Sequence, residues 1–387
     1  MSLRIRIIKT LWLSLFILVG VSLFQVAFAA DYEITDLGML DGHAQSEAYG
    51  INENGQVVGI SYERVGYLNP VYKGHAFLWD SGNMRDLGTL GGDESFAYGV
   101  NNSGRVVGGS VITGSSDQHA FLWQNGTMTD LGTLGGPESY AVAINNIGQI
   151  VGTSNIDPGH YGHIHPFLWQ NGTMTDLGDL DGVTHGSGAE DINDSTQVVG
   201  VGRIENRKHG FLWEDATMTN ISSINNSISS GAYGINNSGQ AVGYVYDNID
   251  GEVVQRVFLL EDGTMTYLNV PGGRGGFRAY AINDSGEVVG TFVMFVGEDW
   301  EDRAFIWKDG SMVDLTELLA LESEWASFYP KAINNAGQIV GYANIVGGSG
   351  RHAILLTPTN VVPEPSSIFL FLSGLFGFFG IGRLKKN

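Results

Sequence analysis

Residues 144–152 read INNIGQIVG, and this phrase decides the fold because the chain contains seven versions of it. The versions are INENGQVVG at 51–59, VNNSGRVVG at 100–108, INNIGQIVG at 144–152, INDSTQVVG at 192–200, INNSGQAVG at 235–243, INDSGEVVG at 282–290 and INNAGQIVG at 333–341. Their starts are 43 to 51 residues apart. Chance does not produce seven such copies, so the chain is built from one repeated unit.

Two further phrases follow the first in each unit. The second stands at 75–79 (HAFLW), 119–123 (HAFLW), 165–169 (HPFLW), 209–213 (HGFLW), 256–260 (RVFLL), 303–307 (RAFIW) and 352–356 (HAILL). The third is typified by TMTDLG at 127–132. Asn125-Gly126 and Asn171-Gly172 join the second phrase to the third. Asn-Gly tolerates positive φ at both turn positions, so these two phrases form a hairpin.

Each unit therefore holds four short strands, which in the second copy lie near 95–100, 105–109, 119–123 and 128–132. We name them a, b, c and d. They are apolar on both faces: in strand c, Phe77 and Trp79 alternate with Ala76 and Leu78. Such sheets must be covered on both sides by neighbours. The period and the seven copies predict an all-β, seven-bladed β-propeller of four-stranded blades, with a β-sandwich or an open solenoid as alternatives.

The two ends of the repeat region predict how the ring closes. Residues 32–38 (YEITDLG) read as a d strand with no c strand before it, and 352–357 as a c strand with no d strand after it. Pairing them completes the seventh blade and removes two exposed edges. Residues 315–328 depart from the repeat, and we expect one or two helical turns there that pack over the closure.

Composition agrees with short strands and excludes several chemistries. The 387 residues include 56 Gly, 43% hydrophobic and only 16% charged residues. The absence of cysteine removes disulfides, cysteine-ligated zinc and thiol catalysis. The net charge is −21, and six of the 20 Lys and Arg residues lie in the two end segments, so the body of the chain is more acidic still. Such an acidic body repels nucleic acid and anionic membranes, so we expect no nucleic-acid partner.

Residues 1–30 have the pattern of a secretory signal peptide. Arg4, Arg6 and Lys9 precede an apolar run at 11–28, and Ala-Phe-Ala at 27–29 matches a cleavage site before the polar start of the mature chain. We expect cleavage at Ala29 or Ala30. An uncleaved membrane anchor is the alternative.

The C-terminal segment 359–387 has its own three-part pattern. Pro363, Glu364 and Pro365 are followed by an apolar run at 368–382 and by Arg383, Lys385 and Lys386. This order resembles the PEP-CTERM sorting signal of Gram-negative bacteria. The resemblance implies an exosortase-type processing enzyme, transient inner-membrane anchoring through an apolar helix at 368–382, and then release to the cell surface or extracellular matrix. A plain C-terminal anchor is the alternative.

The repeat region, 31–358, also resembles a known family. His-Ala-Phe at 75–77 and 119–121, with Asp-Leu-Gly following, is similar to the HAF repeat of bacterial extracellular proteins. The resemblance covers roughly 32–357, although the motif departs to His-Pro-Phe at 165–167 and to Arg-Val-Phe at 256–258. It implies an exported protein and no established reaction.

Repeated residues are expected to be architectural, and departures from the repeat to be functional. The recurring histidines (His75, His119, His165, His209 and His352) should pair within blades, and the recurring tryptophans should lie between blades. The b–c and d–a connections emerge on one face of the ring, which is the predicted binding face. Its candidate binding residues are Asp41, His43, Tyr67, Asp93, Glu94, Asp181, His185, Arg274 and Trp300.

One group of side chains suggests a metal site. His160, His163 and His165 lie close together in the sequence, and with Asp157 they could bind a transition metal. Solvated loop histidines are the simpler interpretation. The acidic loops lack the calcium-loop pattern, and residues 272–276 lack the lysine of a phosphate-binding loop, so we expect no cofactor.

The sequence contains no nucleophile elbow and no HExxH motif. We therefore expect an exported, non-catalytic protein with a binding or structural role at the surface or in the matrix, with exopolysaccharide as a candidate partner. A carbohydrate-active lyase or hydrolase on the same scaffold is one alternative. A protein-binding propeller is the other.

Overall fold

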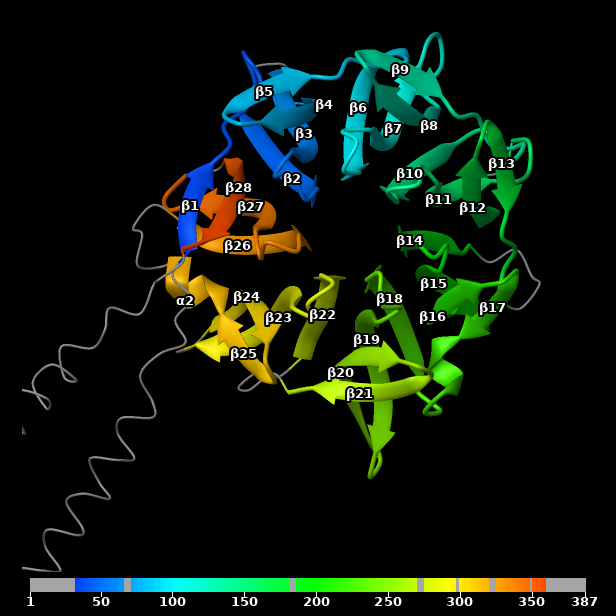
Figure 1. Ribbon diagram of the computed structural model, residues 1–387, viewed down its shortest axis with the longest axis vertical. Coiled ribbons are helices and arrows are strands. Elements are labelled where there is room, and N and C mark those ends of the chain that lie inside the picture. The colour runs from blue at the N-terminus through cyan, green and yellow to red at the C-terminus, as the bar shows by residue number, and fades with distance from the viewer. Residues whose placement is uncertain are drawn as a thin grey trace, which may run out of the picture. The chain divides into compact units, whose positions relative to one another are not determined.

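A computed structural model describes residues 32–65, 71–159, 161–180, 186–269, 275–296, 299–319, 325–348 and 350–359. These residues form seven separate four-stranded antiparallel sheets arranged around a central axis (Figure 1). The predicted signal peptide at 1–30 and sorting signal, including the apolar run at 368–382, lie outside them. In the described part of the chain no helix is long and apolar enough to span a membrane.

Each blade takes its four strands in the predicted order a to d. The strands of the first three blades are β2 (Gln45–Ile51), β3 (Val57–Val65), β4 (Val71–Asp80) and β5 (Asn83–Asp86); β6 (Gly91–Val100), β7 (Val106–Ile112), β8 (Gln118–Gln124) and β9 (Thr127–Asp130); and β10 (Ser139–Ile144), β11 (Ile150–Asn155), β12 (Ile164–Gln170) and β13 (Thr173–Asp176). The next two blades hold β14 (Gly188–Ile192), β15 (Val198–Ile204), β16 (Arg207–Glu214) and β17 (Thr217–Asn220), and β18 (Ser229–Ile235), β19 (Ala241–Ile249), β20 (Glu252–Glu261) and β21 (Thr264–Leu268). The last two hold β22 (Gly275–Ile282), β23 (Val288–Val296), β24 (Asp299–Lys308) and β25 (Ser311–Asp314), and β26 (Trp325–Ile333), β27 (Ile339–Ile345), β28 (Arg351–Pro358) and β1 (Tyr32–Asp36).

The predicted closure of the ring is confirmed. β1 pairs antiparallel with β28, with Tyr32 opposite Pro358 and Ile34 opposite Leu356. The main-chain nitrogen of Leu37 extends the pairing by donating to Ala353 O at 2.9 Å. The chain therefore enters and leaves the propeller side by side, at the end of the seventh blade where the short a–b and c–d turns lie.

The hydrophobic core lies between blades. On strand β4, Phe77 packs into one cluster with Leu37 and Ala353 of the closing blade, whereas Ala76 packs into another with Phe121 of the next blade. Strand c of the other repeats uses the same two faces, which is why its sequence is apolar at consecutive positions. The recurring tryptophans join these interblade clusters, as predicted.

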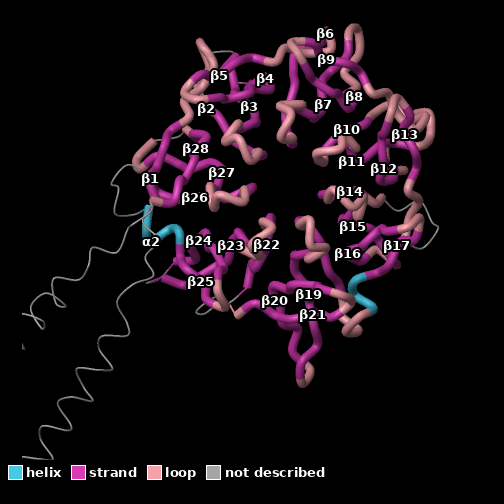
Figure 2. Tube along the Cα trace, viewed as in Figure 1, coloured by secondary structure: helices cyan, strands magenta, loops and turns pink. Residues whose placement is uncertain are grey.

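A ring of asparagines ties the a–b turns together around the axis, where Figure 2 shows the innermost loops converging. Asn101 is representative: its Oδ1 accepts from the nitrogens of Ser103 and Arg105, and its Nδ2 donates to Asn145 O of the next blade. The same interblade bond links each asparagine to the next, in the order Asn52, Asn101, Asn145, Asn193, Asn236, Asn283, Asn334 and back to Asn52.

The insert after β25 is shorter than expected. A helix, α2 (Leu315–Leu319), buries Leu315 and Leu319 against β24 and β26, so its predicted packing role is confirmed. The expectation that the insert runs to residue 328 was wrong. Residues 325–328 belong to β26, because Phe328 is needed in the core between the sixth and seventh blades. A 3-10 turn, η1 (Ile221–Ser223), follows β17.

Candidate functional site

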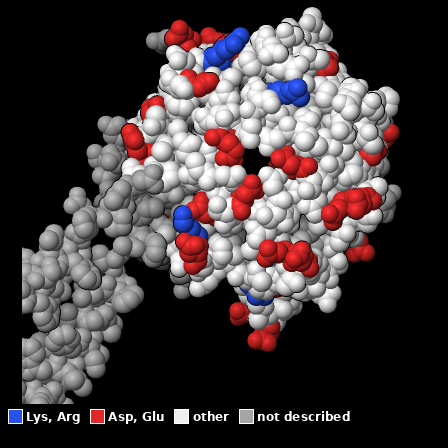
Figure 3. All heavy atoms as spheres, in the orientation of Figure 1, with Lys and Arg blue, Asp and Glu red and all other residues white. Residues whose placement is uncertain are grey.

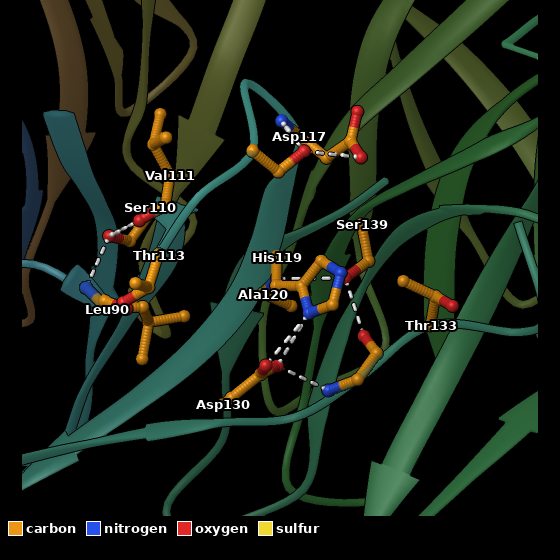
Figure 4. A network of polar contacts seen from close by, with 12 residues as sticks. Leu90, Ser110, Val111, Thr113, Asp117, His119, Ala120, Asp130, Thr133 and Ser139 are labelled. Carbon is orange, nitrogen blue, oxygen red and sulfur yellow. Dashed lines mark hydrogen bonds and ion pairs between the residues drawn. The ribbon is translucent and has the colours of Figure 1, made fainter. Parts of the chain in front are cut away.

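The recurring histidines pair within their blades, as expected. In the second blade, His119 Nδ1 lies 2.8 Å from Asp130 Oδ2, and Asp130 also accepts from Gly132 N (Figure 4). The equivalent pairs are His75–Asp86, His165–Asp176, His352–Asp36 and Arg303–Asp314, while His209 pairs with Ser222. This repeated contact joins strand c to the end of strand d and has a structural role.

Ser139 lies beside the His119–Asp130 pair but does not complete a catalytic triad. Its Oγ accepts from Ala120 N at 2.8 Å and donates to Gly132 O at 2.6 Å. The hydroxyl proton is therefore committed to a main-chain oxygen, whereas an activated nucleophile donates to its histidine.

Four of the predicted binding residues gather where the first two blades meet. Asp41 is exposed in the turn before β2, and the half-buried His43 ring lies 6.0 Å from the ring of His75. Asp93 forms an ion pair with Lys73, and Glu94 follows it. The hydrogen bond to Asp86 raises the pKa of His75, and burial raises the pKa of Glu94.

The other predicted residues do not join this group. Trp300 is 61% exposed and packs against Phe295 at 5.1 Å in the β23–β24 hairpin of the sixth blade. Tyr67, His160, Asp181, His185 and Arg274 lie outside the described residues. Of the described candidates, Trp300 therefore lies on a different blade from Asp41, His43, Asp93 and Glu94.

The histidines of the proposed metal site have separate partners. His163 pairs with Asp157, and His165 Nδ1 lies 2.9 Å from both oxygens of Asp176. Among the described residues no three His, Asp or Glu side chains are grouped so that they could hold a metal ion.

A feature that the loop-based prediction missed lies on the innermost strands. Each strand a carries a β-bulge at the same place, for example between Ala48 and Gly50, where its pairing with strand b shifts by one residue. The bulged residues are Tyr49, Tyr98, Val142, Glu190, Tyr233, Tyr280 and Lys331. Three pairs of consecutive members contact each other across blades: the rings of Tyr49 and Tyr98 are 5.4 Å apart, those of Tyr233 and Tyr280 are 6.3 Å apart, and Lys331 Nζ lies 4.9 Å from the Tyr280 ring.

Further tyrosines extend this ring toward the long-loop face. Tyr342 of β27 stacks on Tyr329 of β26, with ring centroids 5.0 Å apart, and Tyr233 contacts Tyr244 at 5.9 Å. We name the combined set the tyrosine arc: Tyr49, Tyr62, Tyr98, Tyr233, Tyr244, Tyr280, Tyr329 and Tyr342. All except the buried Tyr244 are half-buried, so their rings combine fixed positions with partial exposure.

Charged groups are built into the arc. Glu47 is buried; its Oε1 accepts from Arg351 at 2.6 Å and its Oε2 from the Tyr49 hydroxyl at 2.6 Å. Arg351 also lies over the Tyr342 ring. Burial, with the negative charge of Glu47 nearby, raises the pKa of Tyr62 and of Tyr342 to about 12. These hydroxyls therefore stay protonated and can donate hydrogen bonds across the physiological pH range.

Adjacent carboxylates stand in the fourth blade. Burial raises the pKa of Glu190 to about 7, an effect that Lys208 opposes, and burial raises the pKa of Asp191 to about 7. Asp191 accepts from Ile192 N and from Ile235 N of the next blade. Its role is therefore to join blades, while Glu190 occupies the bulged position.

Acidic side chains dominate the surface around the axis. Figure 3 shows several Asp and Glu residues around the central opening and few Lys or Arg on the same face. The bulge sequences could have indicated the arc: Ala-Tyr-Gly recurs at 48–50, 97–99 and 232–234, while Val142, Glu190 and Lys331 replace the tyrosine elsewhere.

Known structures share the fold at low identity. The β-propeller domain of the Trilobed protease from Pyrococcus furiosus, described as having an open velcro topology, matches with a TM-score of 0.54 and 10% identity, covering 83% of this chain and 97% of that domain. TolB from Acinetobacter baumannii (TM-score 0.35, 10% identity, 79% and 80% covered) and Trypanosoma rangeli sialidase (TM-score 0.38, 10% identity, 92% and 62% covered) also match. The likeness to the Trilobed protease domain supports the propeller fold and nothing further.

Sequence comparisons bear on the location of the protein. No curated protein matches the chain. Residues 361–386 match the PEP-CTERM protein-sorting motif. The chain thus carries a signal that implies export and sorting to the cell surface by an exosortase.

Proposed function

We propose that this protein is a non-catalytic, extracellular binding protein that holds a polysaccharide of the cell surface or matrix through the tyrosine arc. The observation that carries the proposal is the set of mostly half-buried tyrosines on the two innermost strands of five neighbouring blades. Sugar rings present C–H faces that pack on aromatic rings, while tyrosine hydroxyls donate to sugar oxygens. The resemblance to HAF-repeat extracellular proteins agrees with this location.

The direction of the chain ends supports an outward-facing site. Pro358 and Tyr32 lie at the short-turn face of the closing blade, and the sorting motif starts at residue 361. The arc extends toward the opposite, long-loop face. The arc therefore extends away from the face of the propeller on which the described chain ends.

The carboxylates favour binding over hydrolysis. Glycosidases use two carboxylic groups about 5–9 Å apart across a bound sugar. At Glu190 the neighbouring carboxylate, Asp191, is occupied by two main-chain nitrogens. Asp191 is therefore engaged in the structure and does not serve as the second carboxylate beside Glu190.

Retention of the full chain on immobilised polygalacturonate, cellulose and dextran tests the proposal. We expect retention on at least one polymer, and a loss of about tenfold or more for Tyr280→Ala and Tyr342→Ala. Tyr161→Ala is the matched control, because Tyr161 is 58% exposed but lies outside the arc. If the arc variants are retained as well as the wild-type protein, or if no polymer retains the protein, the proposal is contradicted.

The same samples separate the two alternatives. Sustained shortening of the polymer identifies a carbohydrate-active enzyme. Capture of the protein on cell envelopes that survives polysaccharide digestion identifies a protein-binding propeller.

A further inference from the structure

The tyrosine arc carries two cations on adjacent blades. Arg278 of β22 and Lys331 of β26 are the two basic residues in the seven innermost strands. The acidic residues of those strands lie on other blades: Glu47 in the first blade, Asp93 and Glu94 in the second, Glu190 and Asp191 in the fourth. The two cations therefore lie in the part of the arc that the sixth and seventh blades form.

Tyr280 brings the two cations together. Lys331 Nζ lies 4.9 Å from the centre of the Tyr280 ring and 5.6 Å from that of Tyr342. Arg278, two residues before Tyr280, interacts electrostatically with Tyr280, Tyr233 and Tyr244. Among the described residues neither cation forms an ion pair with a carboxylate, whereas Arg351 on the same arc is paired with Glu47. The faces of Tyr280 and Tyr342 hold Lys331 in place, and Arg278 is held by its interaction with Tyr280. Because no described carboxylate pairs with them, both charges are available to a ligand.

We propose that the part of the arc on the sixth and seventh blades binds a carboxylate-bearing sugar, such as a uronate, with Arg278 and Lys331 on the carboxylate and Tyr280 and Tyr342 on the sugar. This deepens, and rests on, the proposed polysaccharide binding. A planar guanidinium matches the two oxygens of a carboxylate, and the ammonium adds a second charge-assisted bond.

Because the protein is strongly acidic, its binding of a polyanion depends on these two cations. A net charge of −21 repels a polyanion at long range, so a uronate polymer can be held only by groups that act at contact distance. Neutralising either cation should therefore remove most of the affinity.

The test compares two ligands that differ only in the carboxylate group, which the reduced ligand replaces with an uncharged hydroxymethyl group. Oligogalacturonate and its carboxyl-reduced form, of matched length, are titrated into the full chain in detergent and followed by calorimetry. We expect the uronate to bind about tenfold or more tightly than the reduced form, and Arg278→Gln or Lys331→Gln each to weaken uronate binding about tenfold. Neither variant should change binding of the reduced form.

Controls separate charge recognition from folding. Lys331→Arg keeps the charge and should keep the preference, and Lys308→Gln removes a cation that is paired with Glu287 outside the arc. Equal thermal midpoints exclude misfolding. Equal binding of both ligands, unaffected by the variants, overturns this inference but leaves polysaccharide binding standing. Binding of neither ligand, together with no retention on any polymer, overturns both. Inorganic phosphate that competes as well as the oligosaccharide also overturns it, because the site would then recognise an anion without the sugar.

Discussion

The side-chain Nδ2 of Asn334 donates to the main-chain oxygen of Asn52 at 3.1 Å, across a sequence separation of 282 residues. Both residues are buried. This bond closes a circle that five other asparagines complete, each with its amide oxygen on its own turn and its amide nitrogen on the next blade. The circle thus fixes turn geometry and the spacing of blades with a single residue type.

We predict that Asn334→Ala destabilises the protein by about 3 kcal/mol, because it removes several buried hydrogen bonds and leaves main-chain groups unpaired. Denaturant unfolding measures the loss. Asn335→Ala, at the neighbouring exposed position, is the control and should cost much less. Equal effects of the two substitutions would contradict a special role for the buried circle.

Thr196 is predicted to be a strained residue that can be improved. It has φ of 67°, where the other six turns have glycine. A β-branched residue is disfavoured there, although Thr196 Oγ1 gains a bond to Gln149. We expect Thr196→Gly to stabilise the protein by about 0.5–1 kcal/mol and Gly286→Thr, the same position two blades on, to destabilise it by about 1–2 kcal/mol. Thermal midpoints check both signs, and a loss of stability in Thr196→Gly would refute the strain.

Glu190 should make stability depend on pH. Its pKa is about 7 in the folded protein and near 4.3 when unfolded, so the folded state holds the proton more tightly. Stability therefore falls as the pH rises from about 4 to 7 and stays lower above. We expect Glu190→Gln to match the wild type at pH 4 and to exceed it by about 1–2 kcal/mol at pH 8. Glu205→Gln, an exposed change on the same blade, is the control. A stability difference between Glu190→Gln and the wild type that does not vary with pH would exclude this explanation.

Removing the closing strand should open the ring. Deletion of residues 32–38 removes β1, which pairs with the outer edge of β28. It also exposes Ile354 and Leu356, which are buried in the intact protein. We expect a lower thermal midpoint and self-association through the free edge of β28, both reversed by a synthetic peptide of residues 31–38. Light scattering and thermal unfolding report the result. A deletion variant that stays monomeric and equally stable would show that β1 is dispensable.

The sequence predicts the architecture well because the repeat contains it. INNSGQ-type turns, the HAFLW strand and the two unpaired end strands specify four strands per blade, seven blades and the closure between 32–38 and 352–357. The tyrosine arc could not be predicted in the same way. Its bulges arise where neighbouring innermost strands approach closely: a Cβ on Gly50 would lie 2.6 Å from Tyr98 O of the next blade. That constraint belongs to the assembled ring and is absent from any one copy of the repeat.

Pairing of β1 with β28 also determines when the ring can close during export. With the signal peptide expected at 1–30, the chain would cross the membrane from its N-terminus, and the first strand would wait for the last before it finds its partner. Six blades are each made of consecutive strands, but the seventh needs residue 358 to have crossed. The ring can therefore close only at the last stage of export, just ahead of the sorting motif at 361–386.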